Sequence, residues 1–232
     1  MDPMGDLREL IVGGLVENIR QVEESRVLWQ EISAHAEAIN EAGFGNMFGR
    51  LQPILARYTV LATCRLYEPE SDKYPLKSIP ATLNHIRYNA DYLQIQNKEF
   101  IIEKLISFGH DRSEFEGIPD PWINQLVRKE FADRLPGQNA PEENEISGAL
   151  HHLKTVRDEF SEHSESVQRL DGARDASMNL LLAFAEDFVG TIGKGYLDID
   201  YVFGDGDSIF RIDAERTTST LQQLLRAAGI QD

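Results

Sequence analysis

Apolar side chains recur every three or four positions along the first part of the chain, from Asp6 to about Ala42, with charged residues between them. This spacing gathers the apolar positions on one face of an α-helix. Gly13 and Gly14 weaken the first turns, and Gly43 is a typical end signal. The pattern therefore predicts one long amphipathic helix.

The next stretch, Phe44 to Tyr67, keeps the helical spacing but has few charged residues. A helix that is apolar over most of its surface is normally buried. We therefore expect a central, mostly buried second helix, with Pro53 as the point where it kinks. The apolar positions behind this expectation are Met47, Phe48, Leu51, Ile54, Leu55, Tyr58, Leu61 and Leu66.

Helix signals continue through the middle of the chain. Ser78 is a good N-cap, and Pro80 fits the first turn of a short helix that follows it. Asp120 and Pro121 form a similar pair at the start of a later helix, which stops before Pro136. The helices expected from these signals and from the apolar spacing cover residues 78–87, 91–108, 120–135, 146–160 and 172–197.

The last part of the chain changes character. Asp198 to Asp213 contains glycines, acids and aromatic residues without a helical period, and a short amphipathic helix follows from Thr217 to Ala228. No stretch shows the alternation of a β-strand. We therefore expect an all-α fold with a helical domain over residues 1–197. The irregular C-terminal extension, residues 198–232, would consist of a loop and a short helix packed on the same domain.

The composition is that of an acidic globular protein. The formal net charge is −16 at pH 7, which opposes general binding to nucleic acid because phosphate is repelled. The one cysteine, Cys64, excludes an internal disulfide and lies in an apolar run, where a small buried hydrophobe is the expected role. No apolar run has transmembrane length, and the N-terminus lacks the order of a signal peptide. A soluble, cytoplasmic protein without membrane contact is expected.

The most reactive combination of side chains is Arg157 and Asp158 followed by His163. Arginine can neutralise a phosphate with a planar fork of donors, and histidine can move a proton near neutral pH. On a continuous helix, Arg157 and His163 would lie about 120° apart around the axis and about 9 Å apart along it. A shared site therefore requires either a break in the helix near Ser161 or a second copy of the protein.

The segment from Val156 to Glu165, with an arginine, a polar residue and then a histidine, resembles the signature of the HEPN superfamily, and more narrowly that of its AbiU-like branch. The run CRLYEP from Cys64 to Pro69, and Leu76 to Leu83 after it, resemble the connection that follows the second helix in this branch. The order of elements is also similar. The resemblance covers roughly residues 6–197.

The resemblance implies a HEPN-like bundle with long antiparallel helices, and a metal-independent endoribonuclease that acts as a homodimer in toxin–antitoxin or phage-defence systems. In that activity the ribose 2′-OH of RNA attacks the adjacent phosphorus, His163 of two subunits serves as acid and base, and Arg157 neutralises the phosphorane. Asp158 would orient the arginine or the histidine. No metal or cofactor is implied. RNA, a second copy of the chain and an antitoxin or other protein are the implied partners.

Other interpretations of these residues stay open. A non-catalytic RNA- or protein-binding module with the same fold is favoured by the acidity of the chain and by Glu162, whose charge next to His163 would oppose a phosphate. A metal site at His151, His152, Glu159 and His163 lacks the second Glu/His helix pair of a di-metal bundle. A solvated helix end, with Arg157 paired to neighbouring carboxylates, is the alternative without any site.

The acidic residues of the C-terminal extension have a simpler interpretation. Asp198, Asp200, Asp205 and Asp207 lack the spacing of a calcium-binding loop. A solvated loop is favoured there.

Overall fold

The computed structural model describes residues 2–70, 76–135, 144–162, 172–203 and 207–230. Within these ranges the backbone forms helices, turns and loops, and the β-type pairing is limited to an isolated bridge between Val202 and Ser208. The expected all-α fold is confirmed. No helix in the described ranges is long and apolar enough to cross a membrane.

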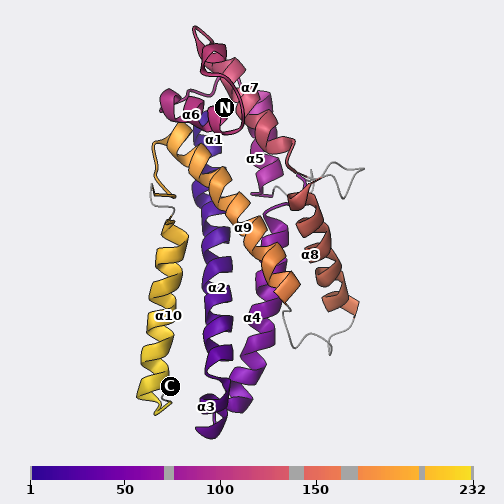
Figure 1. Cartoon of the computed structure of the whole chain (residues 1–232), viewed down its shortest axis with the longest axis vertical. Coiled ribbons are helices and arrows are strands. Elements are labelled where there is room, and N and C mark those ends of the chain that lie inside the picture. The colour runs from indigo at the N-terminus through magenta and orange to yellow at the C-terminus, as the bar shows by residue number, and fades with distance from the viewer. Residues whose placement is uncertain (1, 71–75, 136–143, 163–171, 204–206, 231–232) are drawn as a thin grey trace.

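Long helices that run along one axis set the shape of the described structure (Figure 1). α2, α4 and α10 run side by side along the long axis, α9 crosses α2 and α4, and α8 lies against α9 and α4. The shorter helices α1, α5, α6 and α7 gather at the end that holds the N-terminus. In chain order the α-helices are α1 (Pro3–Leu10), α2 (Glu17–Ala34), α3 (Ala36–Glu41), α4 (Gly45–Arg65), α5 (Ile79–Asn89), α6 (Lys98–Ser107), α7 (Asp120–Ala132), α8 (Glu145–Glu162), α9 (Gly172–Ile192) and α10 (Ile209–Ala227). Shorter turns of other helical types are η1 (Ile11–Val16), η2 (Arg112–Phe115) and η3 (Gly193–Leu197).

The predicted first helix is present, but in segments. α1 is continued by the π-helical turn η1, which contains Gly13 and Gly14, and then by α2. The backbone leaves helical geometry at His35 (φ −101°, ψ 14°) before α3, and Gly43 ends the run with φ +84°. The glycines therefore loosen the helix near its start and terminate it where expected.

The second predicted helix is α4, and the expected burial is correct for only half of it. The part from Ala56 to Cys64 is packed in the core, whereas the first half exposes Met47 by 58% and Ile54 by 62%. α2 packs along α4, α10 packs along α2, and the described part of the chain leaves this face of α4 exposed. The expectation of a mostly buried helix is wrong because hydrophobicity does not show which apolar face finds a neighbour.

Two later helix starts also differ from the prediction. α6 begins at Lys98 rather than near Asp91, because the side chain of Asn97 accepts a backbone hydrogen bond of the first turn at 3.2 Å. The N-cap position of α7 is Pro119 rather than Asp120, whose carboxylate lies 3.0 Å from Lys98 Nζ. Asp120 therefore ties α7 to α6 instead of capping its own helix.

The C-terminal extension is more helical than predicted. α10 begins at Ile209 and not at Thr217, so the last residues of the segment expected to be irregular, 209–213, are helical. Ser208 starts the helix by accepting a hydrogen bond from the Arg211 backbone N–H at 3.3 Å. The helix packs along α2 through an apolar cluster of Ile32, Ile39, Leu221, Leu225 and Ile230.

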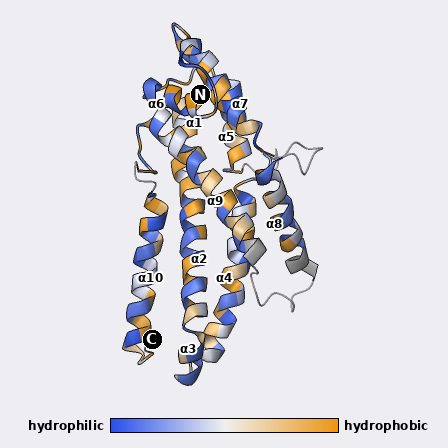
Figure 2. Cartoon of the chain, viewed as in Figure 1, coloured by the Kyte–Doolittle hydropathy of each residue, from blue (hydrophilic) through white to orange (hydrophobic). Residues whose placement is uncertain are grey.

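The main hydrophobic core includes the contact between α7 and α9. Phe131 of α7 is fully buried, and its ring centre lies 5.0 Å from that of Phe188 and 5.8 Å from that of Phe184, both on α9. Along α2, in the middle of the molecule, hydrophobic and hydrophilic colours alternate, as expected for an amphipathic helix (Figure 2). Because α8 packs on α9 and α4, this core fixes the position of the helix that carries Arg157.

Candidate functional site

Two of the three predicted site residues, Arg157 and Asp158, lie together on α8. The Arg157 Nε–H donates to Asp158 Oδ1 at 3.0 Å, and Arg157 Nη1 lies 3.6 Å from Oε1 of Glu68, in the segment that follows α4. The Arg157 side chain is 29% exposed and that of Asp158 is 65% exposed. The guanidinium is therefore at the surface and held beside two carboxylates.

The third predicted residue, His163, lies outside the residues that the structure describes. The described part of α8 extends to Glu162, and it is helical through Ser161, where the alternative of a break was placed. Of the predicted set, the structure therefore brings Arg157 and Asp158 together.

Charged side chains of both signs, Arg157 among them, lie near the buried thiol of Cys64. Burial raises the pKa of Cys64 to about 11; the cations Arg157 and Lys154 act against this rise, and Glu68 and Asp158 add to it. Cys64 is fully buried, which confirms its expected role as a small hydrophobe. Two positive and two negative side chains therefore act on this one thiol.

The paired histidines of α8 have different surroundings. His152 Nδ1 lies 3.0 Å from Ser177 Oγ of α9, whereas His151 is exposed. Among the residues that the structure describes, no three His, Cys, Asp or Glu side chains come together as metal ligands do. His152 therefore links α8 to α9 within the described part of the chain. Glu159 belongs to α8, but its side chain is not among those that the structure describes.

The acidic loop after α9 is partly neutralised. Lys194 Nζ lies 2.8 Å from Asp200 Oδ2 and 3.7 Å from Asp198 Oδ1. Asp205 lies outside the described residues. These carboxylates have a lysine as counter-ion, in keeping with an ordinary surface loop.

A buried group of charges joins α2, α9 and α10, and the sequence patterns did not reveal it. Glu23 and Glu186 are only 4% and 5% exposed. Arg26 Nη2 lies 2.7 Å from Glu23 Oε2, and Arg211 Nη2 lies 3.7 Å from Glu186 Oε2. Burial, followed by the nearby negative charge of Glu23, raises the pKa of Glu186 above its usual range, and Arg211 opposes the rise. In the sequence, the one indication of this buried group was Glu186, a glutamate within the apolar run of α9.

This raised pKa predicts how Glu186 contributes to stability as the pH changes. A carboxyl whose pKa is higher in the folded than in the unfolded state adds stability below the unfolded pKa of about 4.3, and this contribution is lost as the pH rises through the folded value. Replacing Glu186 by glutamine should remove that loss. From pH 4 to pH 7, the free energy of unfolding of Glu186→Gln, measured in urea titrations, should therefore rise relative to that of the wild type.

The control for this experiment is Glu215→Gln, which removes an exposed carboxylate from α10. This variant should keep the pH dependence of the wild type. Equal slopes for the Glu186→Gln variant and the wild type would contradict the assignment.

No protein-family model, no curated protein and no solved structure matches this chain. Inferences about its function therefore rest on the geometry of the described residues.

Proposed function

We propose that the chain is a metal-independent endoribonuclease of toxin or phage-defence type, with Arg157 as the phosphate-binding residue. The carrying observation is the hydrogen bond from Arg157 Nε to Asp158 Oδ1 at the protein surface. This bond holds the plane of the guanidinium through its Nε. The Nη1 and Nη2 groups together form the end edge, where Nη1 lies 3.6 Å from Glu68 Oε1, and a planar pair of donors of this kind suits an oxyanion such as phosphate.

The proposed reaction uses a nucleophile that RNA itself supplies. The ribose 2′-oxygen loses its proton to a base and bonds to phosphorus, while the P–O5′ bond breaks and the leaving oxygen takes a proton from an acid. His163 residues from two copies of the chain would serve as base and acid, and Arg157 would stabilise the charge of the phosphorane. The products are a 2′,3′-cyclic phosphate and a 5′-hydroxyl.

The test is RNA cleavage in EDTA by purified protein and by the variants Arg157→Ala and His163→Ala. Loss of one group that stabilises a transition-state charge typically costs about a hundredfold or more in rate, so both variants should fall by at least that factor. The control is Arg216→Ala, because Arg216 is likewise at the surface and paired with an aspartate, Asp213, of its own helix. Intact RNA with the wild type, or full activity in Arg157→Ala, would refute the proposal.

The position of Glu68 leads to a further prediction for the same site. Its carboxylate, 3.6 Å from Arg157 Nη1, competes with a phosphate for the guanidinium. A pair this exposed contributes roughly 0.5–1 kcal/mol, so Glu68→Gln should tighten RNA binding about two- to fivefold at low salt. The gain should shrink as salt is added. Fluorescence anisotropy with a labelled RNA measures it, and weaker binding by Glu68→Gln would contradict the prediction.

A second candidate is a non-catalytic RNA- or protein-binding module. The observation that favours it is the placement of two carboxylates, Asp158 and Glu68, beside Arg157, which lowers the attraction of the site for a phosphate. RNA that is bound in an Arg157-dependent way but left uncut in the assay above would support this candidate.

A further inference from the structure

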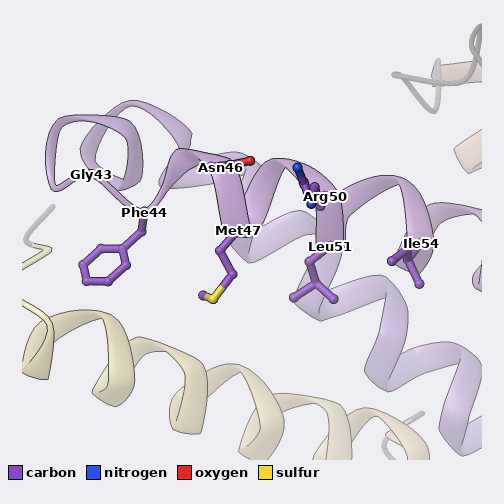
Figure 3. A pocket seen from close by; sticks show the side chains of 7 residues that line it. All are labelled: Gly43, Phe44, Asn46, Met47, Arg50, Leu51 and Ile54. Carbon is purple, nitrogen blue, oxygen red and sulfur yellow. The ribbon is translucent and has the colours of Figure 1, made fainter.

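An exposed apolar stripe runs along the first half of α4. It consists of Phe44, Met47, Leu51, Ile54 and Tyr58, whose spacing of three and four residues places them on one side of a helix. Their exposed fractions range from 37% to 62%. Figure 3 shows the first four side chains projecting from the same side of the ribbon.

The stripe is large enough to form the centre of an interface. The exposed fractions correspond to roughly 450 Å² of side-chain surface, which is within the size of patches that are often functional. One partner in a standard protein–protein interface contributes about 800 Å². A partner would therefore cover this stripe and the polar residues beside it. A shallow groove of about 670 Å³ already follows the first turns, from Gly43 to Ile54.

The charges of α4 are opposite to those of the rest of the chain. The helix contains three arginines, Arg50, Arg57 and Arg65, and no aspartate, glutamate or lysine, whereas the whole chain carries −16. Arg50 and Arg57 are exposed, and each precedes a residue of the stripe by one position, so helical geometry places both on the same flank of it. Arg50 also lines the groove, and its side chain leaves the ribbon on the other side from the four apolar side chains (Figure 3). Neither forms an ion pair within the part of the chain that the structure describes. The surface therefore combines an apolar centre with a positive edge.

Arg50 and Arg57 disfavour pairing of this face with α4 of a second copy of the chain. If Phe44, Leu51 and Tyr58 are the a positions of a heptad, Arg50 and Arg57 are g positions, which set partner choice in paired helices. In an antiparallel pair of α4 helices, g faces g, so arginine would meet arginine. In a parallel pair, g faces e, and the e positions are the half-buried Phe48 and Leu55, which pack within the fold.

We propose that the exposed face of α4 is a docking surface for an acidic amphipathic helix of another protein. The partner helix would place apolar residues at its a and d positions against the stripe and carboxylates against Arg50 and Arg57. The proposal does not depend on the ribonuclease function, because it uses no residue of α8.

The test uses a synthetic peptide of four heptads with leucine at the a and d positions and glutamate at the e and g positions. A second peptide, with lysine in place of each glutamate, is the matched probe. At pH 7 and moderate salt, fluorescence anisotropy should show the acidic peptide binding the full chain at least tenfold more tightly than the basic peptide. Ile54→Asp should weaken binding of the acidic peptide at least tenfold, and Arg50→Glu with Arg57→Glu should reverse the preference between the two peptides.

The control is Tyr88→Asp on α5, since Tyr88 is 73% exposed and lies outside the stripe. This variant should bind the acidic peptide as the wild type does, and circular dichroism should show unchanged helicity in every variant. Equal affinity for both peptides, or binding that survives Ile54→Asp, would overturn the proposal. A wild-type dimer that becomes monomeric in Ile54→Asp would also overturn it, because a second copy would then be the occupant.

Discussion

Replacing Phe131 by alanine is expected to destabilise the fold by about 4 kcal/mol, since truncation of a buried phenylalanine typically costs about 3–5 kcal/mol. Phe131 is fully buried on α7. Its ring meets three others edge-on, at centre distances of 5.5 Å for Phe108, 5.8 Å for Phe184 and 5.0 Å for Phe188. Each contact of this geometry adds stability beyond that of burial alone. Alanine would lose all three contacts and leave a cavity between α6, α7 and α9.

The measurement is urea unfolding followed by circular dichroism, together with the midpoint of thermal unfolding. For a chain of this length, about 4 kcal/mol corresponds to a fall of roughly 8–16 °C in the midpoint. Phe44→Ala is the matched control, because Phe44 is 39% exposed at the start of α4 and should cost less than about 1 kcal/mol. A Phe131→Ala variant as stable as Phe44→Ala would contradict the aromatic cluster.

Replacing Asn124 by alanine is expected to cost about 3 kcal/mol, because this one side chain serves three buried groups. Asn124 Nδ2 donates to the backbone carbonyls of Ala90 at 2.7 Å and Leu93 at 3.0 Å, beyond the end of α5. Asn124 Oδ1 accepts a hydrogen bond from the Tyr196 hydroxyl at 2.8 Å. All four residues are buried, so each partner left without a hydrogen bond carries a desolvation cost of about 1–3 kcal/mol, which relaxation and entering water reduce.

A double-mutant cycle distinguishes this network from simple packing. Tyr196→Phe removes only the hydroxyl and should cost about 1 kcal/mol in the wild-type background. In the Asn124→Ala background, the same change removes a hydroxyl that has already lost its acceptor, so it should be neutral or stabilising. Additive costs in the double variant would show that the two side chains act independently.

The residue pattern was a good guide to local structure, because helices are determined largely by neighbours in the chain. The 3.6-residue spacing predicted the helices later seen as α2, α4, α7, α8 and α9. The predicted Ser78 cap is confirmed by the hydrogen bond that its Oγ accepts from the Ala81 backbone N–H at 3.3 Å. The predicted end at Gly43 is confirmed by its positive φ, which glycine adopts without strain.

The candidate site was predictable as a set of residue types but not as an arrangement. Arg157 and Asp158 were identified from their chemistry, and their adjacency in the chain made their contact possible. Glu68 precedes Arg157 by 89 residues in the sequence, so no local pattern could place its carboxylate beside the guanidinium. The same holds for Glu23 and Glu186, which come together only when α2 and α9 cross.

By itself, the sequence determined that the protein is all-α, where most of its helices begin and end, and which of their faces are apolar. These properties depend on contacts within a few residues, where backbone hydrogen bonds and caps act. Only the tertiary structure decided which apolar faces are covered. It placed α10 along α2, buried the second half of α4 and left the stripe from Phe44 to Tyr58 exposed beside Arg50 and Arg57. The reason is that the hydrophobic effect favours burial of apolar surface without specifying a partner, so packing of the whole chain selects the faces that remain available for binding.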